Sequence, residues 1–475
     1  MSRFLGRENE LELLLELCQK KSASFVVIKG RRRIGKSRLV EELSKHFKKY
    51  YIFSGLAPAG KITANMQLTE FSRQISHQFK TAPARYDDWG DAFWAVGERV
   101  QSGRVLLFFD EISWMGSEDV TFLSKIKNLW DLHLSKNSQL LFVICGSASA
   151  WIEENILSST GFVGRISHTM TLEELPLSTC SKFWPKQISS YEKLKLLSIT
   201  GGIPKYLEEI LPNKSAEENI KRLCFMPGGF LVEEFDRIFS GIFRRESLFY
   251  KQILKVLDEG SRTQTEISSI LSSETKMGRL SEYLWELELA GFIAEDYAWN
   301  FKSKQDSRLK RYRLADNYIR FYLKYIEKNR SKIERNAFSF KSLTALPEWN
   351  SIMGFQCENL VLHNRQEIWK LLKISPEDVV CENPYFQKKT ARASGCQIDY
   401  LIQTKYGTLY VCEIKFSKSQ VGSSILSEMQ SKLKALVVPK GISLRPVLIH
   451  VNGVTEEVID ADYFSEIIDL GQLLI

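Results

Sequence analysis

Short runs of consecutive apolar residues mark the first third of the chain. They cover residues 25–28 (FVVI), 105–109 (VLLFF) and 140–145 (LLFVIC). Uninterrupted runs of this length, rich in β-branched and aromatic side chains, are typical of buried strands. After the first run, Leu39 and Val40 recur with Leu43 at helical spacing. The pattern therefore predicts buried strands, the first of which leads directly into a helix.

The pattern changes to short amphipathic helices in the middle of the chain. It predicts helices within residues 247–260, 262–271 and 274–292, followed by a two-stranded hairpin through 291–297 and 308–316. The second helix starts at Thr263, and Glu266 has the spacing of a capping box. This order of elements resembles a winged helix-turn-helix. The exposed positions of the third helix, which include Lys276, Arg279 and Ser281, give only a weak surface for reading bases.

Two apolar runs near the carboxyl end, 396–402 (CQIDYLI) and 408–417 (TLYVCEIKFS), are joined by a short turn and predict a hairpin. Residues two apart on a strand share a face, so Glu413 and Lys415 are expected to point the same way. Asp399 lies on the preceding strand, across the turn. Asp399 and Glu413 are therefore predicted to meet at one metal ion.

A glycine-rich loop follows the first apolar run and has the spacing of a phosphate-binding site. Gly30 to Ser37 reads G-x-x-x-x-G-K-S between a predicted strand and a predicted helix, which is the context that this motif requires. Backbone N–H groups and the helix N-terminus would hold phosphates. Lys36 is predicted to reach the β- and γ-phosphates of ATP, and Ser37 to bind Mg²⁺.

Acidic and polar residues follow the other two runs. Asp110 and Glu111 come directly after residues 105–109. Asp110 is predicted to bind Mg²⁺ directly or through water, and Glu111 to polarise the attacking water. The run 140–145 leads to Ser147 and Ser149, and a polar residue at this place can sense the γ-phosphate. These residues complete a predicted site for ATP hydrolysis.

Residues 1 to about 235 resemble the archaeal and bacterial ATPase family on the AAA+/STAND side of the P-loop class. The resemblance is carried by FLGRENEL at the start and by GRRRIGKS, LLFFDEI, CGSAS, GRI and GGIPKYL. It implies an α/β P-loop core with a five-stranded parallel sheet over residues 1–175 and a helical lid over 176–240. It also implies that FLGRE lies against adenine, that residues 201–207 approach the nucleotide from the lid, and that Arg165 completes a neighbouring subunit's site. An ordinary ion pair is the alternative for Arg165.

The resemblance assigns nucleotide binding to the loop and its surroundings. The residues are Gly30, Arg31, Arg32, Arg33, Ile34, Gly35, Lys36, Ser37, Arg38, Asp110 and Ser147. Arg31, Arg32 and Arg33 are unusual in such a loop. They either touch the triphosphate or face an acidic partner, and the sequence does not decide between these roles.

The carboxyl-terminal pattern has the residues that a metal-dependent nuclease needs. Two carboxylates hold Mg²⁺, which acidifies a water, while a lysine stabilises the attacking hydroxide. With the helix at 353–372, which carries Glu358, residues 345–475 resemble the PD-(D/E)xK nuclease fold. That resemblance makes Asp399, Glu413 and Lys415 the active triad and Glu358 an additional candidate ligand. Ile398 stands where the family has proline. A structural hairpin and a catalytically idle nuclease fold remain as alternatives.

Positive charge is concentrated in one segment. The 475 residues carry a net charge of +8, whereas residues 301–345 alone hold thirteen Lys and Arg against four acids. Aromatic residues lie between these cations. A concentrated basic segment is typical of proteins that bind polyanions, and a solvated helical face is the alternative. The predicted hairpin contributes Lys302, Lys304, Arg308, Lys310 and Arg311, so we expect phosphate contact without base specificity.

Composition narrows the class of protein. No apolar run approaches the roughly 20 residues that span a bilayer, and the start of the chain lacks a signal-peptide core, so a cytoplasmic protein without a membrane partner is expected. The eight cysteines form no CxxC pair, so the sequence indicates neither a zinc ribbon nor a redox motif.

Three functions are compatible with these features. The first is an ATP-dependent nucleic-acid enzyme that acts in defence against foreign DNA or in DNA processing. The others are a nucleotide-switched regulator with an idle tail and a helper ATPase. The predicted domains are the core (1–175), the lid (176–240), the winged helix (241–344) and the nuclease-like domain (345–475). A homo-oligomer is expected if Arg165 acts between subunits; ring and monomer both remain open.

Overall fold

The computed structural model describes residues 4–57, 62–116, 118–147, 149–242, 247–271, 277–391 and 394–474. By its contacts the chain divides into two compact units. The first comprises the residues up to Glu173 with Asp236–Ser247 and Trp285–Gly291, and the second comprises Glu174–Phe235, Leu248–Leu284 and Phe292–Ile475. The boundaries of the four predicted domains stay a prediction. Among the described residues, no helix is both long enough and apolar enough to span a membrane.

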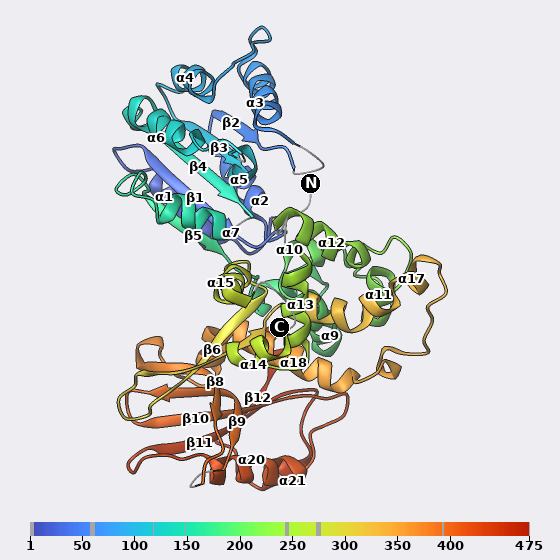
Figure 1. Cartoon of the computed structure of the whole chain (residues 1–475). Coiled ribbons are helices and arrows are strands. Elements are labelled where there is room, and N and C mark those ends of the chain that lie inside the picture. The colour runs from blue at the N-terminus through green and yellow to red at the C-terminus, as the bar shows by residue number, and fades with distance from the viewer. Residues whose placement is uncertain are drawn as a thin grey trace. The chain divides into compact units, whose positions relative to one another are not determined.

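A five-stranded sheet forms the centre of the first unit (Figure 1). Its strands are β1 (Ser24–Gly30), β2 (Lys49–Ser54), β3 (Val105–Asp110), β4 (Leu140–Gly146) and β5 (His168–Leu172). Their order is β2-β3-β4-β1-β5, and all neighbouring pairs are parallel. This confirms the predicted parallel P-loop core. Parallel strands align their carboxyl ends, which is where ligands bind in such sheets.

Helices precede and connect these strands. They are α1 (Glu8–Leu17), α2 (Lys36–Ser44), α3 (Ala64–Phe79), α4 (Trp89–Arg99), α5 (Ile112–Met115), α6 (Phe122–Leu132) and α7 (Ser149–Ile152). As the sequence predicts, α2 begins directly after the loop that follows β1. The position of the glycine motif, between a strand end and a helix start, is therefore as expected.

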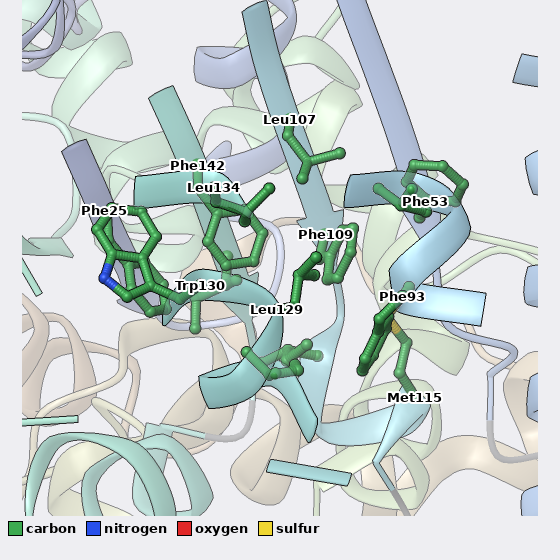
Figure 2. Close-up of a cluster of buried hydrophobic side chains, with 14 of the residues drawn as sticks. Phe25, Phe53, Phe93, Leu107, Phe109, Met115, Leu129, Trp130, Leu134 and Phe142 are labelled. Carbon is green, nitrogen blue, oxygen red and sulfur yellow. The ribbon is translucent and has the colours of Figure 1, made fainter. Parts of the chain in front are cut away.

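One large hydrophobic cluster of the first unit packs on one face of its sheet (Figure 2). Phe25 of β1, Phe109 of β3 and Phe142 of β4 alternate with residues of the other face. The ring centroids of Phe25 and Phe142 are 4.7 Å apart, and those of Phe109 and Phe142 are 5.1 Å apart. Trp130 of α6 and Phe93 of α4 pack against these rings. This packing holds in place the strand ends that carry the candidate site.

A second five-stranded sheet belongs to the second unit (Figure 1). Its strands are β8 (Val379–Gln387), β9 (Cys396–Thr404), β10 (Thr408–Phe416), β11 (Ser443–Val451) and β12 (Glu466–Asp469), in the order β12-β11-β10-β9-β8. The pairs β8–β9 and β9–β10 are antiparallel, whereas β10–β11 and β11–β12 are parallel. The expected hairpin of the carboxyl-terminal third is β9–β10.

The remaining helices follow in chain order. They are α8 (Leu177–Cys180), α9 (Ser190–Thr200), α10 (Pro204–Glu208), α11 (Ala216–Cys224), α12 (Phe230–Ile242), α13 (Ser247–Asp258), α14 (Gln264–Ile270), α15 (Leu280–Leu289), α16 (Asn317–Phe321), α17 (Glu327–Glu334), α18 (Trp349–His363), α19 (Arg365–Leu371), α20 (Ser424–Ala435) and α21 (Glu456–Asp460). Helices α13 to α15 precede the antiparallel hairpin of β6 (Ile293–Trp299) and β7 (Asp306–Leu314), in the predicted order. The capping box of Thr263 and Glu266 is present.

Candidate functional site

Two glycines determine the shape of the phosphate-binding loop. Gly30 ends β1 with a φ of +143°, and a Cβ at this position would lie 2.4 Å from the carbonyl oxygen of Leu172. Gly35 precedes α2 with a φ of 96°. Residues with a side chain rarely adopt positive φ. The backbone therefore requires both glycines that the motif supplies.

Lys36 and Ser37 begin α2 beside the loop. Lys36 Nζ donates to the carbonyl oxygens of Gly30 (2.8 Å) and Arg31 (3.1 Å), and its side chain is buried. Ser37 Oγ donates to Asp110 Oδ2 at 2.9 Å. The structure thus brings the hydroxyl of one predicted motif into contact with the acid of the other.

The acidic end of β3 is tied to the end of β4. The buried Cys145 thiol donates to Asp110 Oδ1 at 2.7 Å. Glu111 Oε2 accepts from both the backbone N–H and the Oγ of Ser147, each at 3.0 Å. Burial raises the pKa of Glu111, whereas the positive charge of Lys36 acts in the opposite direction. Ser147 therefore lies against the acid that is predicted to polarise water.

The oxygen atoms of Ser37 and Asp110 fit a magnesium ion. Mg²⁺ prefers hard oxygen ligands and, beside a nucleotide, uses one or two protein carboxylates together with waters and phosphate oxygens. Among the described residues, no group of three or more His, Cys, Asp or Glu is arranged to hold a metal ion. A two-residue set is sufficient for an ion that a nucleotide also ligates.

The three arginines of the loop have different environments. Arg31 is buried. Arg32 donates to the carbonyl oxygen of Arg237 at 2.6 Å, and its guanidinium carbon lies 5.9 Å from the centre of the Trp114 ring. Arg33 has a positive φ of 72°. Contact of all three with a triphosphate stays a prediction, and Arg32 already has a role in holding the loop.

Arg7 of the FLGRE segment supports the same loop, a role that the sequence pattern does not indicate. Its guanidinium donates to the carbonyl oxygen of the buried Ile34 at 3.3 Å and to the carbonyl oxygen of Glu173. Arg7 also pairs with Glu10 at 2.8 Å. In the sequence, Arg7 is marked only as a charged residue directly before an amphipathic helix. Its contact with Glu173, 166 residues away, is not predictable from the local pattern.

Two other arginines predicted near the nucleotide pair with carboxylates of helices. Arg38 lies 3.2 Å from Glu41 on α2. Arg165 Nε and Nη2 donate to the two carboxylate oxygens of Asp131 at 2.8 and 2.9 Å, and Lys127 contacts the same acid. Hydrogen bonding from Arg165 lowers the pKa of Asp131 to about 2. Any stability from this pair is therefore present above about pH 4 and is lost as the pH falls toward 2.

Comparison of two variants tests whether Arg165 is a finger. Arg165→Ala and Asp131→Ala lose the same ion pair, so both are expected to lower the melting temperature slightly. A finger role predicts that ATP turnover falls about 10³-fold in Arg165→Ala alone. Steady-state hydrolysis at saturating ATP measures this difference. Equal, undiminished turnover in the two variants would make Arg165 an ordinary ion-pair partner.

Three acids of the second unit lie close enough to perturb one another. Tyr400 of β9 pairs with Cys412 of β10, which sets Asp399 beside Glu413. Burial and the negative charge of Glu413 raise the pKa of Asp399 to about 6. Burial and the charge of Asp399 raise the pKa of Glu358, on α18, to about 8. The structure brings these predicted residues together; their role as metal ligands stays a prediction.

Two lysines contact this acid cluster. Lys415 Nζ lies 3.0 Å from Glu413 Oε1 and 2.9 Å from Glu428 Oε2. Lys432 of α20 donates to Glu413 Oε2, and its Nζ lies 3.6 Å from Asp399 Oδ1. Lys415 was predicted from the Glu-x-Lys pattern, whereas Lys432 was not. The acids and lysines together form one cluster of opposite charges contributed by β9, β10 and α20.

Two buried arginines influence Glu358, and one of them, Arg313, belongs to the β6–β7 hairpin. Arg320 and Arg313 both lower the pKa of Glu358 against the effect of burial. Arg313 of β7 pairs with Asp296 of β6 at 2.9 Å and donates to Asn359, the residue after Glu358. The hairpin therefore helps to position the helix that carries Glu358.

The end of the hairpin is also part of the core under the second sheet. Trp299 Nε1 donates to Gln403 Oε1 at 2.6 Å, and Gln403 Nε2 donates to the carbonyl oxygen of Phe301 at 2.8 Å. The rings of Phe301 and Tyr385 stack with centroids 5.0 Å apart. Trp299 and Phe301 belong to the same buried cluster as Ile398 of β9. This part of the hairpin has a packing role.

The basic segment 301–345 is only partly a charged surface. Most of its aromatic side chains are buried, namely Phe301, Tyr318, Phe321, Tyr322 and Tyr325. These rings therefore fill the core rather than forming part of the charged surface. The exposed cations are Lys302, Lys304, Arg308, Lys310, Lys328, Lys332, Arg335 and Lys341.

The third helix of the predicted winged helix presents little free positive charge. Arg279 donates to both carboxylate oxygens of Glu282, at 2.7 and 2.6 Å. Ser281 accepts from Gln264 at 2.7 Å. Lys276 lies outside the described residues. These contacts agree with a weak surface for base recognition.

The chain is similar to a known protein family and to a protein of known sequence. Residues 4–210 match a family described as an ATPase domain predominantly from Archaea. An uncharacterized protein of Methanocaldococcus jannaschii is 30% identical over 374 residues, which cover 78% of this chain and 79% of that protein.

Two solved structures are similar at a greater distance. The Walker-type ATPase of Pyrococcus abyssi is 19% identical, with a TM-score of 0.49, and the match covers 67% of this chain and 96% of that one. The ORC2 protein of Aeropyrum pernix is 14% identical, with a TM-score of 0.40, and the match covers 71% of this chain and 98% of that one. Neither likeness says what this chain binds.

The family match includes the glycine loop, the acidic end of β3 and Ser147, whose contacts are those described above. The match to the M. jannaschii protein extends over most of both chains. The chain is thus a P-loop ATPase that belongs to the family of this M. jannaschii protein, with an ATPase domain of the predominantly archaeal type.

Proposed function

We propose that this ATPase couples its nucleotide cycle to metal-dependent cleavage of nucleic acid by the carboxyl-terminal domain, which we assign to the PD-(D/E)xK type. The observation that carries the proposal is the meeting of Asp399, Glu413 and Lys415 beside Glu358. Mutual repulsion of buried acids is costly unless a cation or a proton offsets it. Such an arrangement is typical of functional sites rather than of simple core packing.

Asp399 and Glu413 would hold Mg²⁺ through carboxylate oxygens. The described structure does not arrange Glu358 with them as a three-acid metal site, so Glu358 would have to move to become a further ligand. A bound Mg²⁺ neutralises the scissile phosphate and acidifies a water. Lys415, whose ammonium lies 3.0 Å from Glu413, stabilises the developing hydroxide on the same face of β10. In the first unit, Lys36 binds the β- and γ-phosphates, Ser37 and Asp110 hold the nucleotide's Mg²⁺, and Glu111 orients water with Ser147 as the sensor.

The exposed cations in the turn of the β6–β7 hairpin and along β7 are the proposed contacts with DNA phosphates. Changing Lys302, Lys304, Arg308 and Lys310 together to glutamine should weaken binding alike for all sequences. Lys310 should contribute least, because its Nζ already pairs with Glu295 Oε1 at 2.7 Å. The slope of log K against log salt should flatten by roughly one unit for each lost contact. Fluorescence anisotropy over a salt series measures this slope.

A matched control comes from the same hairpin. Arg311 donates to Ser261 Oγ at 3.0 Å and to its carbonyl oxygen, so its guanidinium is engaged within the protein. Arg311→Gln is therefore expected to lower stability and to leave the slope unchanged. A slope that does not change in the fourfold variant would leave these lysines and Arg308 as a solvated face.

Cleavage itself is tested with end-labelled single-stranded DNA, duplex DNA and RNA, each with Mg²⁺ or Mn²⁺ and with or without ATP. We expect cleavage of at least one substrate, its loss in EDTA, and its loss in Asp399→Asn. Absence of cleavage in every combination would remove the nuclease part of the proposal and leave the ATPase part standing.

A nucleotide-switched interaction protein with an idle tail is the second candidate. It is favoured by the packing of Trp299 and Phe301 into the core of the second unit, which resembles interdomain packing more than a free DNA-binding wing. In that case nucleotide should alter the oligomeric state or partner binding without cleavage. Sizing with and without a non-hydrolysable ATP analogue distinguishes a homo-oligomer from a monomer.

A further inference from the structure

The lysine that contacts both acids of the carboxyl-terminal site comes from a helix outside the Glu-x-Lys pattern. Ile425 and Met429 of α20 are buried, and Lys432 follows at the spacing that keeps it on the same face. The side chain of Lys432 is 27% exposed, while that of Glu413 is 4% exposed. A lysine at a core-facing position of a helix requires a partner, and here it has two.

The carboxylate oxygens of the two acids are all engaged. Lys432 contacts Glu413 Oε2 and Asp399 Oδ1, Lys415 contacts Glu413 Oε1, and the N–H of Ile414 donates to Asp399 Oδ2 at 2.9 Å. The second partner of Lys415 is Glu428, on α20. Of these two lysines, Lys432 is the one whose ammonium contacts both acids. Its ammonium therefore occupies the position that bridges the two carboxylates.

We propose that Lys432 is a positioning residue that holds Asp399 and Glu413 together before a divalent cation binds, and that the cation must displace it. The inference rests on the proposed function, which makes these acids the metal ligands. A divalent cation takes oxygen atoms from both carboxylates. Two cations in one bridging position repel each other strongly in a partly buried site.

The lysine is able to leave. Its ammonium is carried on a flexible four-carbon stem, and more than a quarter of the side chain is exposed. Displacement breaks two charge-assisted contacts, which opposes metal binding. Lys432 therefore tunes the site toward weaker binding of divalent cations, while it keeps the repelling acids together when no metal is bound.

Mn²⁺ binding without nucleotide tests this inference without relying on cleavage. Bound Mn²⁺ is measured by electron paramagnetic resonance, and the amount bound by Asp399→Asn is subtracted to isolate this site. Lys432→Met keeps the length of the side chain and removes the charge, so Mn²⁺ should bind about tenfold more tightly. Lys432→Arg places a permanent, bidentate cation on the acids and should bind Mn²⁺ more weakly than wild type.

Lys434→Met is the matched control, because Lys434 is exposed on the same helix. It should bind Mn²⁺ like wild type. A purely structural Lys432 predicts equal or weaker binding in Lys432→Met, and either result overturns the inference. If neither wild type nor Lys432→Met shows Mn²⁺ binding that depends on Asp399, the metal site of the proposed function falls together with this inference. Tight binding in Lys432→Met with no cleavage supports the inference and contradicts only the nuclease activity.

Discussion

Lys36→Ala is expected to weaken ATP binding by about 100-fold, because one charge-assisted contact to the phosphates is lost in a buried site. In the structure the Lys36 ammonium is bonded to two loop carbonyls, so it already points into the loop that would surround the phosphates. Isothermal titration with ATP and Mg²⁺ measures the change. Lys45→Ala is the control, since Lys45 is exposed at the end of the same helix; a comparable loss there would point to damage to α2.

Glu111→Gln separates binding from chemistry in the same site. Glutamine can still accept the hydrogen bonds that Ser147 donates to Glu111, and Asp110 still serves Mg²⁺. ATP should therefore bind normally while turnover falls by about 10²–10⁴-fold, the usual contribution of a general base. Phosphate release at saturating ATP gives the rate. Hydrolysis at the wild-type rate would contradict the assignment of Glu111.

Asp399→Ala and Glu413→Ala are each expected to reduce nucleic-acid cleavage to background. One carboxylate holds a hard divalent cation poorly, so the site loses both its metal and the activated water. Lys415→Ala should keep metal binding largely intact and slow only the chemical step. Single-turnover cleavage combined with Mn²⁺ binding distinguishes these two outcomes.

Two kinds of control variant distinguish loss of the metal site from unfolding of the domain. Removing one acid leaves Lys432 with an incomplete partner set, which is destabilising in a buried site; Asp399→Asn and Glu413→Gln keep the shape of the side chains. Glu466→Ala, at an exposed position of β12, should cleave normally. All of these variants should hydrolyse ATP at the wild-type rate, because their substitutions lie in the other compact unit. Loss of ATPase activity together with cleavage would indicate a general effect on folding.

Local pattern was enough to predict the elements around the nucleotide. The runs that became β1, β3 and β4 are apolar throughout and their strands are almost wholly buried, so their type was clear without tertiary information. Gly30 and Gly35 mark the loop because no other residue fits their backbone. The β9–β10 hairpin was also predictable from local pattern, because two apolar runs are joined by a short turn. Its pairing places Asp399 beside Glu413.

Contacts between distant parts of the chain were not predictable in this way. Trp299 bonds to Gln403 across 104 residues, and Arg7 reaches Glu173 across 166. Lys432 could have been noticed from its spacing with Ile425 and Met429, but its partners lie on other elements. Residues 318–326 are apolar on most sides of the helix, which is a pattern of burial, and the aromatic side chains of this stretch are indeed buried.

Nicking of supercoiled plasmid by wild type and Lys36→Ala, each with and without ATP in the presence of Mg²⁺, is the most direct test of coupling between the two sites. We predict that wild type nicks the plasmid and that ATP changes the rate of nicking several-fold. A change of this size is similar to the fold-change that a typical coupling free energy between two sites produces. Lys36→Ala should nick at one rate under both conditions. Equal rates for wild type with and without ATP, or no nicking at all, would contradict an ATPase that controls a nuclease.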